Sequence, residues 1–337
     1  MSVIFSSAAR NSTAIAEMLN NANEYMDWRH DPLRYLWSTF CVCSTFMWFG
    51  FAGDNLQYYR MNGGLAYAGG ATVRSITAES FGRSGLFLLA YRACALWACA
   101  MYESTFGSAF IRKNEATGTY ALSMSDFLNL HDWTVHAVTA FFLLATIASI
   151  LGVCSTSATL DHYLGHNGRC NTLGHWVMAL YTVAFTMSVT FAVTVFGEAI
   201  FSPQCVPSSA RGEWSTLTSP DSRLCYLEPQ YMLGYIGAVV VMLLEASIGR
   251  LTFPKCYMSQ PIFYCSSFFI LNHFNVVFLQ GDWSYNWTNF LRKETVVYLN
   301  MFMTLVMVTY YALVKFLHAN ANNASIKQLE ERVPLFM

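Results

Sequence analysis

Charged residues are scarce in this chain of 337 residues. Asp, Glu, Lys and Arg together make up 12% of it, about half the share in an ordinary soluble domain. The formal net charge is -1, so the chain has no basic field for nucleic acid. Its 20 glycines and 8 prolines exclude collagen-like and low-complexity chains. What remains is 55% hydrophobic and 16% aromatic, which is typical of an integral membrane protein.

Motifs for common catalytic and cofactor sites are also missing. The chain contains no Walker loop, no GxSxG elbow, no HExxH pair, no CxxC and no zinc spacing. A retinal-binding opsin is excluded because Lys315, the only lysine of the last apolar run, lies near the end of that run. We therefore expect neither a metal ion nor a cofactor.

The ten cysteines do not form a recognisable disulfide framework. Half of them lie in apolar runs, where cysteine acts as a small hydrophobic residue. Two further pairs each share one loop, Cys205 with Cys225 and Cys154 with Cys170. These loops are expected on opposite sides of a membrane, so at most one pair lies in an oxidising compartment. Whether either pair is bridged stays open.

Long apolar runs dominate the chain and predict an all-α, polytopic transmembrane bundle. About 20 residues of helix cross the hydrocarbon layer. The runs are continuous, so they predict helices and not the alternating strands of a barrel. We expect about seven spans, at residues 35–52, 84–104, 127–153, 175–200, 231–249, 261–280 and 295–317.

Orientation and compartment are weakly encoded. Counted over the expected loops, Lys and Arg divide nine against nine between the two sides of the membrane, so the positive-inside rule selects no topology. The even division favours a chain that is oriented by its partners or by a different insertion route. The N-terminus is rich in Ser and Ala, contains Arg10 and has no acidic residue before Glu17, a weak likeness to a mitochondrial address. We expect the mitochondrial inner membrane, with the endoplasmic reticulum or plasma membrane as alternatives.

Three ionisable residues in apolar surroundings are candidates for function, because charges inside a membrane are costly. Arg92 lies in the middle of the second run, where it needs an acidic partner. The candidates are Asp132 and Glu245. A structural ion pair that fixes the register of the helices is the simpler interpretation, and a substrate-binding or catalytic role is the alternative.

Histidines offer a weaker signal for metal or haem. His131 and His136 are five residues apart, which places them about 140° apart on a helix and prevents them from sharing one ion. Only His136 and His273 lie where two spans could present histidines to a haem. A single histidine in a span more often forms a hydrogen bond to a neighbouring helix, so we expect no metal site.

Four short motifs, taken in order, resemble the rolling stone and androgen-induced group of polytopic membrane proteins. The first motif, Leu86-Phe-Leu-Leu-Ala-Tyr-Arg92, ends in the intramembrane arginine, and the second, His131-Asp-Trp-Thr-Val135, resembles the Thr-Asn-Trp segment of the family. The third, Met242-Leu-Leu-Glu245 with Gly249-Arg-Leu-Thr-Phe-Pro254, resembles the Leu-Leu-Glu stretch of the family with a basic residue and proline beyond it. The fourth, Trp283-Ser-Tyr-Asn-Trp-Thr-Asn-Phe-Leu291, resembles the Tyr-Pro-x-Leu-Asp-Trp turn of the family.

The resemblance implies a division of the chain into four parts. A six-span, family-like membrane domain would cover residues 84–318. The first span and its loop, 35–83, would be an addition to it. Polar segments at 1–34 and 319–337 would complete the chain.

Some members of this family hydrolyse fatty acid esters of hydroxy fatty acids with an intramembrane threonine as nucleophile and a histidine as base. A hydroxyl needs such a base to attack an ester. Here His131 stands at the threonine position, and the histidine position falls near Met232 or Tyr235. The resemblance therefore implies the family fold with both catalytic positions replaced.

Two functions from different classes follow. The first is a noncatalytic accessory subunit of a larger membrane assembly, such as a respiratory or ATP synthase complex, whose partners are membrane lipids and other integral membrane subunits. The second is an intramembrane hydrolase of fatty acid esters, in which Thr134 or a nearby hydroxyl attacks and His136 or His273 serves as base. The replaced catalytic positions favour the first.

Overall fold

A computed structural model describes most of the membrane-embedded part of the chain. The described residues are 32–61, 75–77, 85–106, 111–113, 120–122, 130–155, 162–164, 172–201, 229–251, 253, 257–279, 288–291 and 293–320. The expected N-terminal address with Arg10 and the C-terminal tail 321–337 lie outside these residues, as do Cys170, Cys205 and Cys225.

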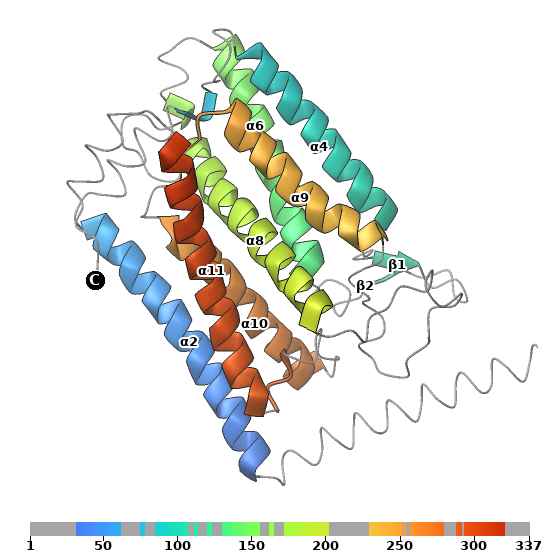
Figure 1. Cartoon of the computed structure of the whole chain (residues 1–337), viewed down its shortest axis with the longest axis vertical. Helices are drawn as coiled ribbons and strands as arrows, with labels where there is room; N and C mark the ends of the chain where they lie inside the picture. The colour runs from blue at the N-terminus through green and yellow to red at the C-terminus, as the bar shows by residue number, and fades with distance from the viewer. Residues whose placement is uncertain are drawn as a thin grey trace, which may run out of the picture.

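Seven long helices form the described bundle, and each coincides with one of the seven expected apolar runs (Figure 1). Contacts show that neighbouring helices run in opposite directions. The end of the helix at 86–106 meets the start of the helix at 130–154, and the start of that helix meets the end of the helix at 173–201. The helices are α2 (Pro32–Met61), α4 (Leu86–Phe106), α6 (Leu130–Cys154), α8 (Leu173–Phe201), α9 (Pro229–Ile248), α10 (Ser259–Leu279) and α11 (Lys293–Asn320).

Helix α8 lies at the centre of the bundle. Helices α6 and α9 pack against α8 on one side, and α4 packs on them at the edge of the bundle; α10 and α11 pack on the other side, and α2 packs on them at the opposite edge (Figure 1). Its side chains are accordingly the most enclosed, since 72% of its apolar stretch is buried, against 22% in α2 and 17% in α4. An all-round apolar helix is expected to be central in such a bundle.

Aromatic and sulfur contacts join the two sides of the bundle through α8. Phe253, just beyond α9, lies 5.2 Å from Tyr181 of α8 and 5.3 Å from Tyr310 of α11, measured between ring centroids. On α10, the Sγ atom of Cys265 lies 3.2 Å from the Sδ atom of Met187. Large, polarizable groups of this kind fill irregular gaps between helices.

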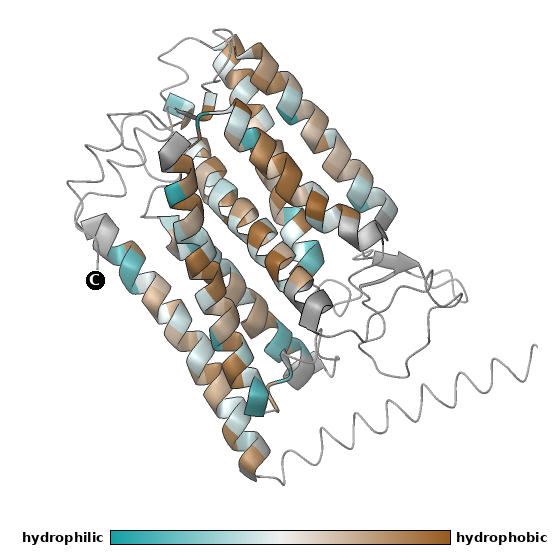
Figure 2. Ribbon diagram, viewed as in Figure 1, coloured by the Kyte–Doolittle hydropathy of each residue, from teal (hydrophilic) through white to brown (hydrophobic). Residues whose placement is uncertain are grey.

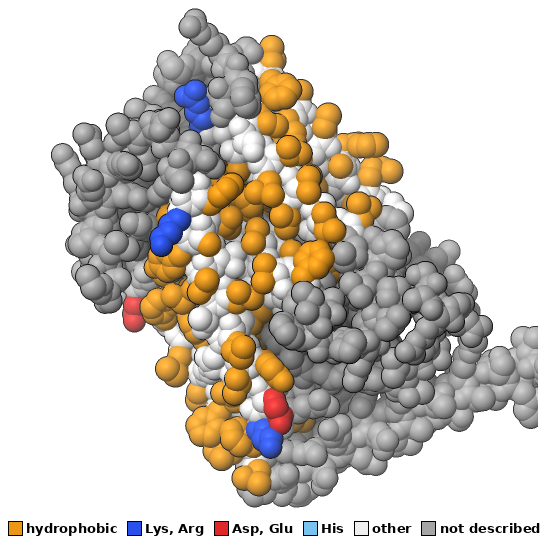
Figure 3. Space-filling view, in the orientation of Figure 1, with side chains coloured by type: hydrophobic (Ala, Val, Ile, Leu, Met, Phe, Trp, Pro, Cys, Tyr) orange, Lys and Arg blue, Asp and Glu red, His pale blue; other side chains and the backbone are white. Residues whose placement is uncertain are grey.

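Hydropathy supports a multi-pass membrane protein, with fewer certain spans than the sequence predicted. Five helices, α2, α4, α6, α8 and α11, are long and apolar enough to cross a membrane. Hydrophobic residues recur along the helices (Figure 2), and hydrophobic side chains are spread over the described part of the face that Figure 3 shows. The apolar part of α9, Leu233–Ile248, is shorter. Helix α10 carries the buried amides Asn272 and Asn275, which dilute its apolar character. The expected seven spans are therefore established as helices but not as spans.

One small exception interrupts the expected all-α fold. Strands β1 (Ile111–Lys113) and β2 (Tyr120–Leu122) pair antiparallel between α4 and α6, with Arg112 opposite Ala121. A short 3₁₀ turn, η1 (Ser75–Thr77), packs against α6 and α8. Thr77 lies so close to Gly152 of α6 that an added Cβ there would be 2.7 Å from the threonine methyl group.

The first helix belongs to the same bundle as the other six. The sequence predicted a span at 35–52, and the helix found there, α2, is longer and packs along α10 and α11. Asn300 of α11 accepts hydrogen bonds through Oδ1 from Ser44 Oγ, at 3.0 Å, and from Trp48 Nε1, at 2.9 Å. Ser259 Oγ of α10 donates to Asn55 Oδ1 of α2 at 3.0 Å. These bonds fix α2 in register with its neighbours.

Candidate functional site

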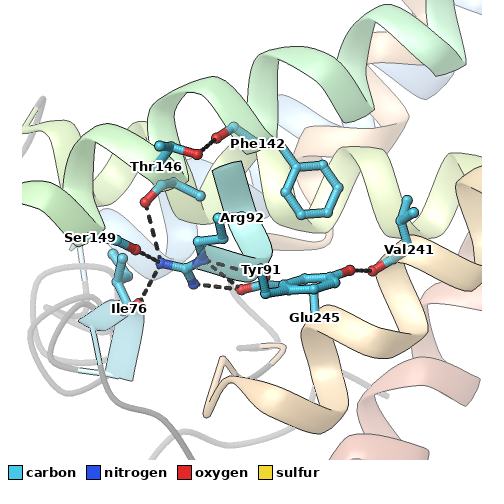
Figure 4. Close-up of polar contacts among 9 residues, drawn as sticks. Ile76, Tyr91, Arg92, Phe142, Thr146, Ser149, Val241 and Glu245 are labelled. Atoms are coloured by element: carbon cyan, nitrogen blue, oxygen red, sulfur yellow. Dashed lines mark hydrogen bonds and ion pairs between the residues drawn. The ribbon is translucent and has the colours of Figure 1, made fainter. Parts of the chain in front are cut away.

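Arg92 forms an ion pair with Glu245 in the interior of the bundle. The guanidinium of α4 and the carboxylate of α9 are both 0% exposed. Arg92 Nη2 lies 2.5 Å from Oε1 of Glu245, and Nε lies 3.0 Å from the same oxygen and 3.3 Å from Oε2 (Figure 4). Such a fork geometry is among the strongest hydrogen-bonding arrangements in proteins.

The remaining nitrogen of Arg92 is also fully used. Nη1 donates to the backbone oxygen of Ile76 in η1 at 2.8 Å, to Ser149 Oγ of α6 at 2.7 Å and to the backbone oxygen of Ala145 at 3.3 Å (Figure 4). One side chain therefore joins α4, α6, α9 and the 3₁₀ turn. Because the donors are satisfied by protein atoms, the buried charge is compensated without a substrate.

Small and aromatic neighbours allow the two helices to approach at this point. Gly249 closes the last turn of α9, and its amide donates to the backbone oxygen of Glu245 at 2.8 Å. An added Cβ there would lie 2.9 Å from that oxygen and 3.2 Å from Oε1 of the carboxylate. Tyr91, the residue before the arginine, donates from its hydroxyl to the backbone oxygen of Val241 at 2.5 Å (Figure 4). Residues of both α4 and α9 thus enclose the ion pair.

Asp132, the other candidate partner, lies near the start of α6, whereas Arg92 contacts α6 near its end. Its side chain is buried, only two residues after α6 begins. Ser149, the α6 side chain that bonds Arg92, follows 17 residues later, which is about 25 Å along the helix axis. The structure thus selects Glu245 from the two candidates.

A second polar cluster lies near Asp132, where α4 ends and α6 begins. Tyr102 Oη of α4 and His131 Nε2 of α6 are 3.0 Å apart in a hydrogen bond. His131 is 2% exposed, and its ring contacts the rings of Phe191 of α8 and Tyr235 of α9, which also contact each other. An added Cβ on Gly234 would overlap the hydroxyl of Tyr102 and lie 2.6 Å from Cε1 of His131. The cluster depends on this glycine.

His136 belongs to a separate group on the outer side of α4 and α6. Its Nδ1 lies 3.0 Å from Oε1 of Glu103, and Thr139 Oγ1 donates to the same oxygen at 2.6 Å. The side chains of His136 and Glu103 are 42% and 25% exposed, whereas His131 is buried. The two histidines therefore face different directions, as their five-residue spacing predicted. We call Glu103, His136 and Thr139 the carboxylate–imidazole cluster.

The three residues of the predicted hydrolase site are not brought together. Thr134 is buried, and its hydroxyl donates to the backbone oxygen of Leu130, one turn earlier on the same helix, at 2.8 Å. His136 bonds Glu103. His273 lies on α10 and stacks on Phe290 with ring centroids 4.9 Å apart. Neither histidine is hydrogen-bonded to Thr134 among the contacts that the structure describes.

Sequence reasoning missed several residues that the structure makes important. Glu103 and Thr139 complete the carboxylate–imidazole cluster, and Ser149 and the Ile76 carbonyl complete the coordination of Arg92. Glu103 had a usable signal, because it lies near the end of one apolar run and His136 near the start of the next. The Ile76 carbonyl had none, since it comes from the backbone of a loop.

Metal and disulfide chemistry find little support in the part of the chain that is described. No group of three or more His, Cys, Asp or Glu among those residues is placed to hold a metal ion. Cys154 carries a free thiol, while the other cysteines of the two predicted loop pairs lie outside the described ranges. Cys41 is buried and Cys43 is exposed, so the two point to different sides of α2.

No protein-family model, no curated protein and no solved structure matches this chain. The resemblance to the rolling stone and androgen-induced group therefore stays a prediction from its four motifs.

Proposed function

We propose that this chain is a noncatalytic integral-membrane subunit that packs against the spans of partner proteins in a larger membrane assembly. The outward face of α2 is the observation that carries the proposal. Phe40, Met47 and Phe51 follow one another at helical spacing on the side away from α10 and α11, and Met47 is 75% exposed. Aromatic residues and methionine are enriched in protein interfaces.

Gly50 on the same face strengthens the argument. A glycine inside a helix costs about 1 kcal/mol relative to alanine. Among the described residues, no atom outside the local backbone of α2 lies within 4 Å of the place where a Cβ would be, so no described contact requires the glycine. Small residues allow close approach of a second helix in membranes. A partner span against α2 accounts for both Gly50 and the large side chains around it.

The buried polar groups suit a structural subunit. Arg92 and Glu245 are closed to solvent and bound to each other, and the Thr134 hydroxyl is bound within its own helix. The geometry at Thr134 thus gives the hydrolase alternative no support.

The mitochondrial inner membrane is the compartment that we propose for this assembly. Its support is the Ser- and Ala-rich N-terminus with Arg10 and the even division of basic residues between the two sides. The endoplasmic reticulum and the plasma membrane are the alternative outcomes of a fractionation experiment.

Native-gel mass spectrometry of gently solubilised membranes tests the assembly. We expect the chain to comigrate with other integral membrane subunits at fixed stoichiometry, in mitochondrial membranes. A free 38.0 kDa species would contradict the proposal.

A matched pair of variants tests the surface. Gly50→Leu fills the open position on α2 and should release the chain from the assembly while leaving it folded. Ala100→Leu makes a similar change on the exposed face of α4 and should leave the assembly intact. Equal effects of the two variants would refute docking through α2.

A further inference from the structure

The carboxylate–imidazole cluster has unused hydrogen-bonding capacity that the fold does not explain. Glu103 accepts both of its bonds, from His136 and Thr139, at the single oxygen Oε1. Within the described part of the chain, Oε2 of Glu103 and Nε2 of His136 have no partner. When the imidazole carries both protons, Nδ1 donates to the carboxylate and Nε2–H is left to donate outward. The cluster then presents one acceptor and one donor side by side.

The charges of this pair sum to zero but are separated in space. A carboxylate and an imidazolium present a negative and a positive point next to each other on the surface. A zwitterion of the opposite arrangement complements them without a net charge to neutralise. The ligand chemistry that matches is an ammonium beside a phosphate.

The depth of the cluster fits the polar boundary of a membrane. The candidate span of α4 ends at Thr105 and that of α6 begins at Leu130. Glu103 lies two residues inside the first and His136 six residues inside the second, which is about 3 Å and 9 Å along the helix axes. Lipid headgroups meet the acyl chains at this depth.

An apolar stripe continues from the cluster towards the middle of the membrane. Leu143, Ile147 and Ile150 follow His136 on one face of α6, at intervals of seven, four and three residues, and are 48%, 41% and 46% exposed. This spacing keeps them in line on a helix. The stripe extends about 21 Å from the histidine, more than the roughly 15 Å of one hydrocarbon leaflet. A polar head followed by an apolar stripe is the pattern of a phospholipid.

We infer that Glu103, His136 and Thr139 bind the headgroup of a zwitterionic aminophospholipid. The lipid ammonium donates to Oε2 of Glu103, and Nε2 of His136 donates to a phosphate oxygen. Thr139 positions the carboxylate through its bond to Oε1. One acyl chain lies along Leu143 and Ile147. The site stands whether or not the chain belongs to a larger assembly.

Native mass spectrometry of the purified full-length protein tests the site. The protein is equilibrated with equal amounts of phosphatidylethanolamine and phosphatidylglycerol that carry identical dioleoyl chains. We expect the wild type to retain phosphatidylethanolamine preferentially. Glu103→Gln keeps the shape and the acceptor for Thr139 but removes the charge, and should lower this retention about tenfold, the effect of one charged hydrogen bond.

Glu294→Gln is the matched control, because Glu294 is a 50% exposed carboxylate at the start of α11. This variant should retain phosphatidylethanolamine like the wild type. No preference between the two lipids in the wild type, or equal retention by Glu103→Gln, would overturn the inference. A photoreactive residue at Leu143 should crosslink to lipid in intact membranes, and a crosslink to a peptide would assign the site to a partner protein instead.

Discussion

On one side of α8, helices α4, α6 and α9 meet around the charged pair of Arg92 and Glu245. On the other side, α2, α10 and α11 meet around neutral amides, of which Asn300 is the clearest example. The charged side concentrates its bonds on one guanidinium, whereas the amide side distributes them along its helices.

This difference predicts different responses to mutation. Removing one member of a buried ion pair strands the other charge in a medium that cannot solvate it. Removing a neutral hydrogen bond between membrane helices costs about 0.6 kcal/mol on average, because the separated helices find other partners. The charged side should therefore fail as a unit, and the amide side should weaken in small steps.

The largest effect is expected from Arg92→Leu. Glu245 would be left buried without its partner, which costs about 3–5 kcal/mol. The double variant with Glu245→Leu should recover part of this loss, because two apolar side chains replace the pair. A double-mutant cycle from unfolding in mixed micelles measures the coupling, and a simple sum of the two single effects would contradict it.

Gly234→Ala tests the approach of α9 to the rest of the charged side. The new methyl group would lie 2.6 Å from Cε1 of His131, and relieving such an overlap costs about 1–3 kcal/mol. Gly237, three residues later, is the control, because no described atom outside the local backbone of α9 lies within 4 Å of its Cβ position. Gly237→Ala should be neutral or stabilise the protein by up to about 1 kcal/mol. Similar midpoints of thermal unfolding for the two variants would be inconsistent with this packing.

Asn300→Leu addresses the amide side. It removes the acceptor for Ser44 and Trp48, and should lower the free energy of unfolding by about 1 kcal/mol, roughly two interhelical bonds. Thr304→Val is the control, since the exposed Thr304 hydroxyl donates only to the backbone of its own helix. If both variants lose stability equally, α2 is not held by Asn300.

Thr134→Val should have the smallest effect. The substitution removes only a bond within α6, and a threonine hydroxyl that bonds back to its own helix adds little to stability, so we expect a change of at most about 0.6 kcal/mol. Thr139→Val is the matched comparison and should cost about 1 kcal/mol, because it removes a bond to the carboxylate of Glu103. Turnover of a long-chain hydroxy-fatty-acid ester that disappears with Thr134→Val would revive the hydrolase interpretation.

The helices were largely predictable because each apolar run is continuous and polar segments separate the runs. The first run shows the limit of this reasoning. This run mixes serines and cysteines with its apolar residues, and some of these small residues face the bundle: Ser44 bonds Asn300 and Cys41 is buried. Composition cannot distinguish a weak span from one whose polar residues face a neighbour.

The ion pair was predictable to two candidates, and depth could have decided between them. Arg92 lies in the first half of α4 and Glu245 near the end of α9, so alternating helices bring them to one level. Asp132 lies in the first turn of α6, at the opposite end of that helix from Ser149, which bonds Arg92. The same argument brings Glu103, near the end of α4, towards His136, in the first part of α6. The contact of Ile76 with Arg92 depends on the path of a loop, which no periodicity encodes.

The separation of Arg92 from its partner along the chain also has a consequence for biosynthesis. Glu245 follows 153 residues after Arg92, and a ribosome adds about 5–20 residues per second. If the chain inserts while it is being made, α4 must wait about 8–30 s for its counter-ion. An arginine near the centre of an isolated helix opposes insertion by about 2.5–3.5 kcal/mol. In that case the timing of translation, and not only the final packing, governs how α4 enters the membrane.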